Sequence, residues 1–204
     1  MIKIASIVLA AGRSARMAPR NKLVEPVLVE PVSGEPMIRR VVATVLESGV
    51  RPVIAVTGFE AGRITQALNR LDVAIVTNPD YADGLSASLR TGLEAVPPDA
   101  DGALISLGDM PEIEIPVIRA LMAEFKGRGA ICVPVHRGRR GNPVLWGRDY
   151  FPEMMKLTGD SGAKPLVARH AAHLVEVDVA TDSIFHDIDT PADLARLNQP
   201  GAGR

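Results

Sequence analysis

Short apolar runs rich in β-branched residues recur along this chain and alternate with segments of helical periodicity. Most of each run is apolar, without the alternation of a half-exposed strand, which is typical of strands buried on both faces of a parallel sheet. Parallel strands need crossovers of about a dozen residues, and the helical segments supply them. The runs are Ile4 to Leu9, Pro52 to Thr57, Val73 to Thr77, Ala103 to Leu107, Ala130 to Val135 and Leu174 to Val179.

The helical segments between these runs mostly end at glycine or proline, as helices commonly do. The alternation predicts an α/β fold of three layers, in which a mostly parallel, Rossmann-like sheet lies between two layers of helices. Ligands of such sheets bind beyond the carboxyl ends of the strands, so the loops that follow strands should form the site. The predicted helices are Met37 to Glu47, Glu60 to Arg70, Leu85 to Ala95 and Ile115 to Lys126.

The pattern changes after Val135. Residues 136–146 predict a hairpin with a basic, glycine-rich turn, which would be an antiparallel addition to the sheet. Thr190 to Leu197 predicts a last helix with Thr190 as N-cap and Pro191 at its first position. We expect one domain over residues 1–198 and a frayed tail at 199–204.

Composition limits the classes of partner. The 204 residues are 47% hydrophobic and 23% charged, as in globular domains, and the net charge of -1 lacks the basic surface of nucleic-acid-binding proteins. No run approaches the roughly 20 apolar residues of a membrane-spanning helix. The single cysteine, Cys132, lies in an apolar run and indicates a buried thiol. We expect a cytoplasmic protein without nucleic-acid or membrane partners.

The loop after the first strand is both glycine-containing and basic. Leu9-Ala10-Ala11-Gly12 is followed by Arg13, Ser14 and Arg16, and then by Lys22. Small residues let a phosphate group approach the backbone closely, and the cations suit its charge. The spacing matches neither the Walker A loop nor the dinucleotide fingerprint. A solvated basic loop is the alternative interpretation.

Two aspartates are candidate metal ligands. Asp109 follows the run that ends at Leu107, and Asp189 precedes the last helix, with Asp187 two residues before it. Magnesium is usually bound by one or two carboxylates together with substrate phosphates and water. The competing interpretations are a turn-forming aspartate before Pro111 and a capping role for Asp189.

A polar segment also follows the third predicted strand. Asn78 comes directly after that strand, and Gly84, Ser86 and Ser88 enter the next helix, where backbone amides can read a base edge or a ribose. The alternative interpretation is purely structural: the two serines would cap the helix, and Gly84 would be a turn residue.

The segment from Leu9 to Met17, followed by Lys22, resembles the opening of the glycosyltransferase-A-like nucleotidyltransferases, which share the fold of nucleotide-diphospho-sugar transferases. The resemblance implies that residues 9–12 line the base and ribose, and that residues 13, 14 and 16 contact the β- and γ-phosphates. It places Lys22 at the α-phosphate and a metal ion at Asp109 and Asp189. Where the family usually has glycine, this chain has Ala18, at which a positive φ is harder to adopt.

Four short motifs in order resemble the molybdenum cofactor cytidylyltransferase family, over about residues 4–197. The resemblance implies transfer of CMP from CTP to the phosphate of molybdopterin, release of pyrophosphate, Mg²⁺ or alternatively Mn²⁺ as the ion, and transient contact with a molybdenum hydroxylase. Ala11 stands where guanylyl relatives have glycine, which favours CTP, and Gly141 with Asn142 is expected at the pterin. The motifs are Asn78-Pro79-Asp80-Tyr81-Ala82, Gly108-Asp109-Met110-Pro111, Gly141-Asn142-Pro143 and Asp187-Ile188-Asp189-Thr190-Pro191.

Other functions remain open at this point. The same residues suit a GTP-dependent molybdopterin guanylyltransferase, or cytidylyl or uridylyl transfer to a sugar or polyol phosphate. A molybdopterin-binding accessory protein without turnover is a different class, and the presence of Lys22, Asp109 and Asp189 argues against it.

Overall fold

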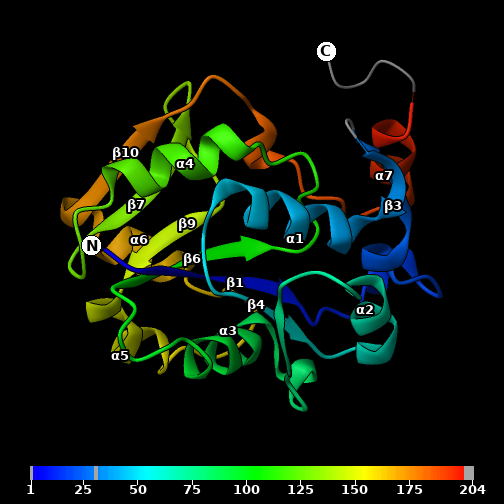
Figure 1. The fold of residues 1–204 in the computed structure, drawn as a ribbon, viewed down its shortest axis with the longest axis horizontal. Helices are drawn as coiled ribbons and strands as arrows, with labels where there is room; N and C mark the ends of the chain where they lie inside the picture. The colour runs from blue at the N-terminus through cyan, green and yellow to red at the C-terminus, as the bar shows by residue number, and fades with distance from the viewer. Residues whose placement is uncertain (1, 30–31, 200–204) are drawn as a thin grey trace.

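A computed structural model describes residues 2–29 and 32–199 of the chain (Figure 1). Within these residues the main sheet has the strand order β10-β7-β9-β6-β1-β4-β5. The strands predicted from the apolar runs are all present, and β6, β1, β4 and β5 are parallel neighbours, as are β7 and β10. Their bounds are β1 Ile4–Ala10, β4 Val53–Thr57, β5 Ala74–Thr77, β6 Gly102–Leu107, β7 Ile131–His136 and β10 Leu174–Asp178.

The antiparallel strand lies inside the sheet. β9 (Val144–Gly147) pairs with β6 on one side and β7 on the other, antiparallel to both. Its side chains Leu145 and Trp146 are 0% and 1% exposed, so both faces of the strand are covered. The predicted basic turn joins β7 to β8 (Arg139–Arg140). The hairpin therefore inserts a strand between two parallel halves, and only its two-residue arm β8 lies outside the main order.

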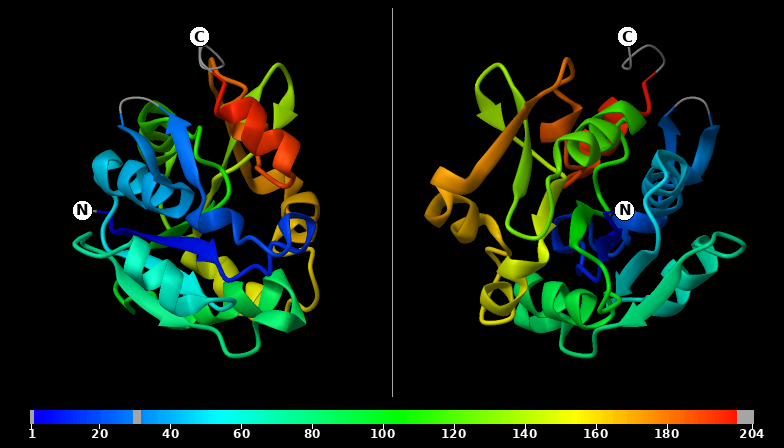
Figure 2. Two further views of the ribbon diagram at one scale, coloured as in Figure 1. Left: turned by 90° about the vertical axis from the view of Figure 1, so that its right-hand side faces the viewer. Right: turned by 60° about the vertical axis from the view of Figure 1, so that its left-hand side comes forward.

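Helices cover both faces of the sheet (Figures 1 and 2). Side chains of β1 alternate between the two layers, so that Val8 packs with the α1 face and Ile7 with the α3 face. This arrangement confirms the three-layer α/β fold. One layer contains α1 (Met37–Ser48), α2 (Ala61–Ala67) and α4 (Ile115–Glu124), and the other contains α3 (Leu85–Glu94), α5 (Phe151–Met154) and α6 (Lys164–Arg169).

A small hairpin that the sequence did not predict precedes α1. β2 (Pro26–Val29) and β3 (Val32–Pro36) pair antiparallel. The predicted last helix α7 (Pro191–Leu197) packs beside β2 and starts at a capping box between Thr190 and Asp193, which confirms the predicted N-cap. Of the expected frayed tail, residues 200–204 lie outside the described residues, as do residues 30–31 of the hairpin.

Short 3₁₀ turns complete the described chain, in which no helix is long and apolar enough to cross a membrane. These turns are Ala15–Met17, Lys22–Val24, Tyr81–Asp83, Arg148–Tyr150, Ala171–His173 and Ser183–Phe185.

Gly92 sets how closely α3 approaches the sheet. A Cβ atom at this position would lie 2.5 Å from Ile7 Cγ2 and 3.0 Å from Val56 Cγ2. We predict that Gly92→Ala destabilises the protein by about 1–3 kcal/mol through overpacking, although alanine is the better helix former by about 1 kcal/mol. Chemical denaturation measures the change.

Gly62 in α2 is the matched control, because no atom lies within 4 Å of its virtual Cβ. Gly62→Ala should stabilise the protein by about 0.5–1 kcal/mol. Equal effects of the two substitutions would contradict the close approach of α3.

Candidate active site

A cleft of about 540 Å³ opens where β1 and β6 end, between the basic loop, the start of α3 and the segment before α7. Most of the residues expected at the site line it. These are Leu9, Ala11, Gly12, Arg13, Ser14, Arg16, Lys22, Gly84, Ser88, Asp109 and Asp189. Seven other residues line it. Ala15, Tyr81 and Ala82 belong to the sequence motifs, Asp160 lies on a loop (residues 158–164) that the family resemblance places at the acceptor side, and Leu23, Leu85 and Leu107 had no expected role.

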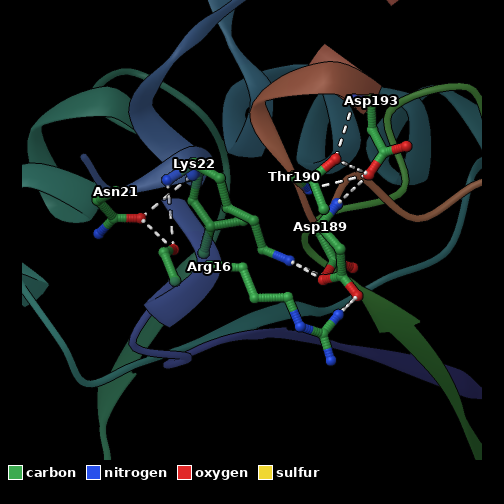
Figure 3. Close-up of polar contacts among 9 residues, drawn as sticks. Arg16, Asn21, Lys22, Asp189, Thr190 and Asp193 are labelled. Atoms are coloured by element: carbon green, nitrogen blue, oxygen red, sulfur yellow. Dashed lines mark hydrogen bonds and ion pairs between the residues drawn. The ribbon is translucent and has the colours of Figure 1, made fainter. Parts of the chain in front are cut away.

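Lys22 joins the two aspartates at the centre of the cleft. Its ammonium nitrogen Nζ donates to Asp109 Oδ2 at 2.7 Å and to Asp189 Oδ1 at 2.7 Å. Arg16 donates to the other oxygen of Asp189 (Figure 3). The Lys22 side chain is only 11% exposed, so these contacts are poorly screened by water. A cation is thus held between two carboxylates that lie far apart in the sequence.

The backbone fixes the two carboxylates relative to β1. Gly108 N–H donates to the Leu9 carbonyl at 2.9 Å, and a Cβ atom on Gly108 would lie 2.9 Å from that oxygen, so a side chain there would push the loop away. Ile188 N–H donates to the Asp109 carbonyl at 2.9 Å. These two bonds place the loop after β6 between the loop after β1 and the segment that precedes α7.

The basic loop is shaped by Ser14, which has the left-handed φ of +50° that is uncommon outside glycine. Its hydroxyl donates to Asn21 Oδ1 at 3.3 Å and accepts from Lys22 N–H at 3.2 Å, which closes the loop on itself. Ala18 has a φ of -50°, so the position where relatives usually have glycine requires no positive φ in this chain.

The two carboxyl groups differ in electrostatic environment. Burial raises the pKa of Asp109 above its usual value, and the Lys22 ammonium offsets only part of that rise. Burial also acts on Asp189, but Lys22 and Arg16 outweigh it and bring the pKa of Asp189 below its usual value. Desolvation lowers the pKa of Lys22, and its two carboxylate partners more than reverse this, so the ammonium stays charged.

Asp109 and Asp189 fit a divalent cation. Asp109 Oδ1 is buried without a hydrogen-bond partner, and such an unpaired oxygen is a strong candidate ligand. No group of three or more His, Cys, Asp or Glu side chains within residues 2–29 and 32–199 is arranged to hold a metal by itself. The aspartate pair therefore suits an ion that completes its shell with phosphates and water. Asp187 is exposed and does not line the cleft.

The remaining expected residues do not line the cleft. Ala10 is 1% exposed and packs in the core. The Asn78 amide donates to the Ser88 hydroxyl at 3.1 Å, so Asn78 holds the side chain of Ser88, which lines the cleft. Ser86 is fully buried, and its N–H donates to the Gly159 carbonyl.

Gly141 and Asn142, expected at the pterin, instead contact the turn that contains Ile184. A Cβ on Gly141 would lie 2.5 Å from the Ile184 carbonyl oxygen, and Asn142 N–H donates to the same oxygen at 3.0 Å. The glycine is required here by backbone packing.

The fold and this site together define a nucleotidyltransferase: a mostly parallel sheet, a basic glycine-containing loop after β1, and two carboxylates at the edge where β1 and β6 end. Residues 6–174 match the model of the MobA-like NTP transferase domain, and the chain belongs to that family.

Individual relatives agree with this assignment. The chain is 27% identical to the molybdenum cofactor cytidylyltransferase of Escherichia coli (strain K12) over 194 residues, which are 95% of this chain and 94% of that protein. A nucleotidyl transferase structure from Methanothermobacter thermautotrophicus superposes with a TM-score of 0.82 at 27% identity, covering 96% of both chains. The manganese complex of Rv0371c from Mycobacterium tuberculosis H37Rv gives a TM-score of 0.73 at 27% identity, over 96% of this chain and 98% of that one.

The opposite pKa shifts predict opposite effects of neutralising the two aspartates in metal-free buffer. Asp109→Asn should raise the free energy of unfolding at pH 7, because it removes a charge that burial disfavours by more than Lys22 compensates. Asp189→Asn should destabilise it by about 1 kcal/mol, because it removes a carboxylate that Lys22 and Arg16 stabilise. Urea unfolding of both variants tests this.

The pH dependence has a defined sign. The penalty for charged Asp109 is full above its raised folded-state pKa and vanishes below the ordinary value of 3.8. The contribution of Asp189 is present above 3.8 and is lost as the pH falls through its lowered pKa. Both variants should therefore converge on the wild type in acid, and parallel unfolding curves across pH would contradict the assignment.

Proposed function

We propose that this protein transfers CMP from CTP to the phosphate of molybdopterin and releases pyrophosphate, with Mg²⁺ as its metal. The observation that carries the proposal is the Lys22 ammonium held between Asp109 and Asp189 at the strand ends. The extended similarity to the cytidylyltransferase of Escherichia coli supports the choice of reaction.

The cleft suits a nucleoside triphosphate. Arg13, Arg16 and Lys22 line it together with the small residues Ala11 and Gly12, so guanidinium groups and backbone amides can both face phosphate oxygens. We assign Arg13 and Arg16 to the β- and γ-phosphates and Lys22 to the α-phosphate. The base and ribose then occupy the part of the cleft lined by residues 9–12, Gly84 and Ser88.

Asp109 and Asp189 would hold the Mg²⁺ ion, with Mn²⁺ as an alternative. When bound, the ion supplies positive charge that stabilises the phosphates. Lys22 pairs with both of these carboxylates. If such an ion neutralised the two carboxylates, the Lys22 ammonium would be free to face the α-phosphate.

The reaction needs no protein nucleophile. An oxygen of the acceptor phosphate forms a bond to the α-phosphorus of CTP, and the bond from that phosphorus to the oxygen bridging to the β-phosphate breaks. The electron pair leaves with pyrophosphate, which Arg13 and Arg16 stabilise. The acceptor phosphate is already ionised, so a general base is unnecessary, which accords with the absence of histidine among the described residues that line the cleft.

Base selection needs more than Ala11. Ala11 is 3% exposed, and a Cβ atom on Gly58 would lie 2.9 Å from its methyl carbon, so this methyl group narrows the cleft only slightly. One methyl group distinguishes substrates by about 1–3 kcal/mol at most.

Incubation with each of the four nucleoside triphosphates, Mg²⁺ and molybdopterin tests the reaction. Pyrophosphate release is expected with CTP, and chelation by EDTA should abolish it, with recovery on adding Mg²⁺ or Mn²⁺. Release with GTP alone would refute cytidylyl transfer. Absence of turnover with every nucleotide, together with molybdopterin binding, would favour the accessory protein.

Lys22→Met should lower kcat by about 10²–10³-fold, the loss expected when one donor to a developing charge is removed. Lys126→Met is the control, because Lys126 follows α4, is 70% exposed and does not line the cleft. Its steady-state rate should equal that of the wild type. If Lys22→Met had the kcat of the wild type, the Lys22 ammonium would not stabilise the transition state.

A further inference from the structure

Asp160 is an exposed carboxylate at the cleft. It lines the same cavity as Arg13 and Lys22, but it lies on the loop between α5 and α6, far from the basic loop in sequence. Lys22 pairs with Asp109 and Asp189, whereas the Asp160 side chain has no hydrogen bond or ion pair within the described part of the chain. The carboxylate is therefore available to a ligand.

The backbone that carries this carboxylate is tied to the entry to α3. The Gly159 carbonyl accepts a hydrogen bond from Ser86 N–H at 3.0 Å, which ties the loop to the first turn of the helix. Asp160 Oδ1 lies 2.5 Å from the place of a Cβ on Gly84, whose φ of +99° also favours glycine. The backbone at Gly84 thus makes room for the carboxylate.

The charge of Asp160 restricts which part of a nucleotide lies beside it. A helix N-terminus attracts anions, but here a carboxylate already lies at the start of α3 and would repel a phosphate. The neighbouring part of the ligand must be uncharged and must donate a hydrogen bond. Leu85 lines the same cavity and lies beside this loop, since a Cβ on Gly162 would lie 2.8 Å from Leu85 Cδ2. It provides an apolar contact for a flat ring, which favours the base over the ribose.

We propose that Asp160 accepts a hydrogen bond from the exocyclic amino group of cytosine and thereby selects CTP over UTP. Carboxylates pair with the N4 amino group of cytosine, whereas uracil presents the acceptor O4 at the same position and is repelled. Asp160 is then a specificity-determining residue. The inference rests on the proposed function only in that a pyrimidine nucleotide occupies the cleft.

Titration calorimetry with CTP, UTP and dCTP, in the presence of Mg²⁺ and without an acceptor, tests this assignment without relying on turnover. The wild type should bind CTP about tenfold more tightly than UTP, as expected for one hydrogen bond to a charged group. In Asp160→Asn the amide can donate to O4, so the ratio of the dissociation constants of UTP and CTP should fall to about one. The affinity for dCTP should change by the same factor as the affinity for CTP.

Asp83→Asn is the matched control. It makes the same change on the exposed turn before Gly84, but Asp83 does not line the cleft, so the ratio should stay as in the wild type. Thermal unfolding of both variants establishes that they remain folded.

Three results would overturn the role of Asp160. The first is equal affinity of the wild type for CTP and UTP, and the second is an equal decrease in affinity for both nucleotides in Asp160→Asn. The third is a decrease in affinity for CTP but not for dCTP, which would indicate a contact with the ribose. Each is compatible with pyrophosphate release from CTP, so the proposed function would stand. Binding of GTP alone would instead refute the proposed function.

Discussion

The contact on which the site depends is the ammonium of Lys22 between the carboxylates of Asp109 and Asp189. Two partly buried like charges repel each other, and each loses hydration, so they remain close only when a cation lies between them. Parallel pairing of β1 with β6 brings the loops after both strands to one edge, and the bond from Ile188 N–H to the Asp109 carbonyl adds the segment before α7. The fold thus assembles the site from three distant parts of the chain.

Much of the fold could be predicted, because strands buried on both faces need continuous apolar sequence. This holds for β1 and β6. The helices between strands are recognisable from the helical spacing of their apolar residues and from the glycine or proline that ends them. The location of β9 could not be predicted, because Val144–Gly147 is short and only its pairing partners decide whether it lies inside the sheet or at an edge. The β2–β3 hairpin contains prolines, which weaken any strand signal.

The site was predictable where chemistry and strand ends coincide, as at Asp109, Asp189 and the basic loop. Sequence could not reveal that Lys22 joins the two aspartates, because their separation depends on the closed fold. A motif also cannot distinguish a glycine that admits a ligand from one that admits a neighbouring backbone, and Gly141 is of the second kind. Asp160 lies on a loop without periodicity, which the family resemblance associates with the acceptor, so only its place in the cleft points to the nucleotide.

The central place of β9 has a consequence for how the chain acquires its structure. Until residues 144–147 pair, β6 ends one half of the sheet with an open edge, although β1, β4, β5 and β6 already come from the first 107 residues. During synthesis that half can assemble early and must tolerate an unpaired hydrogen-bonding edge, which is prone to pair with other strands. The carboxylate of Asp189 arrives later still. Because Asp189 follows every strand of the main sheet in sequence, the pair of carboxylates cannot form until the whole sheet has been synthesised.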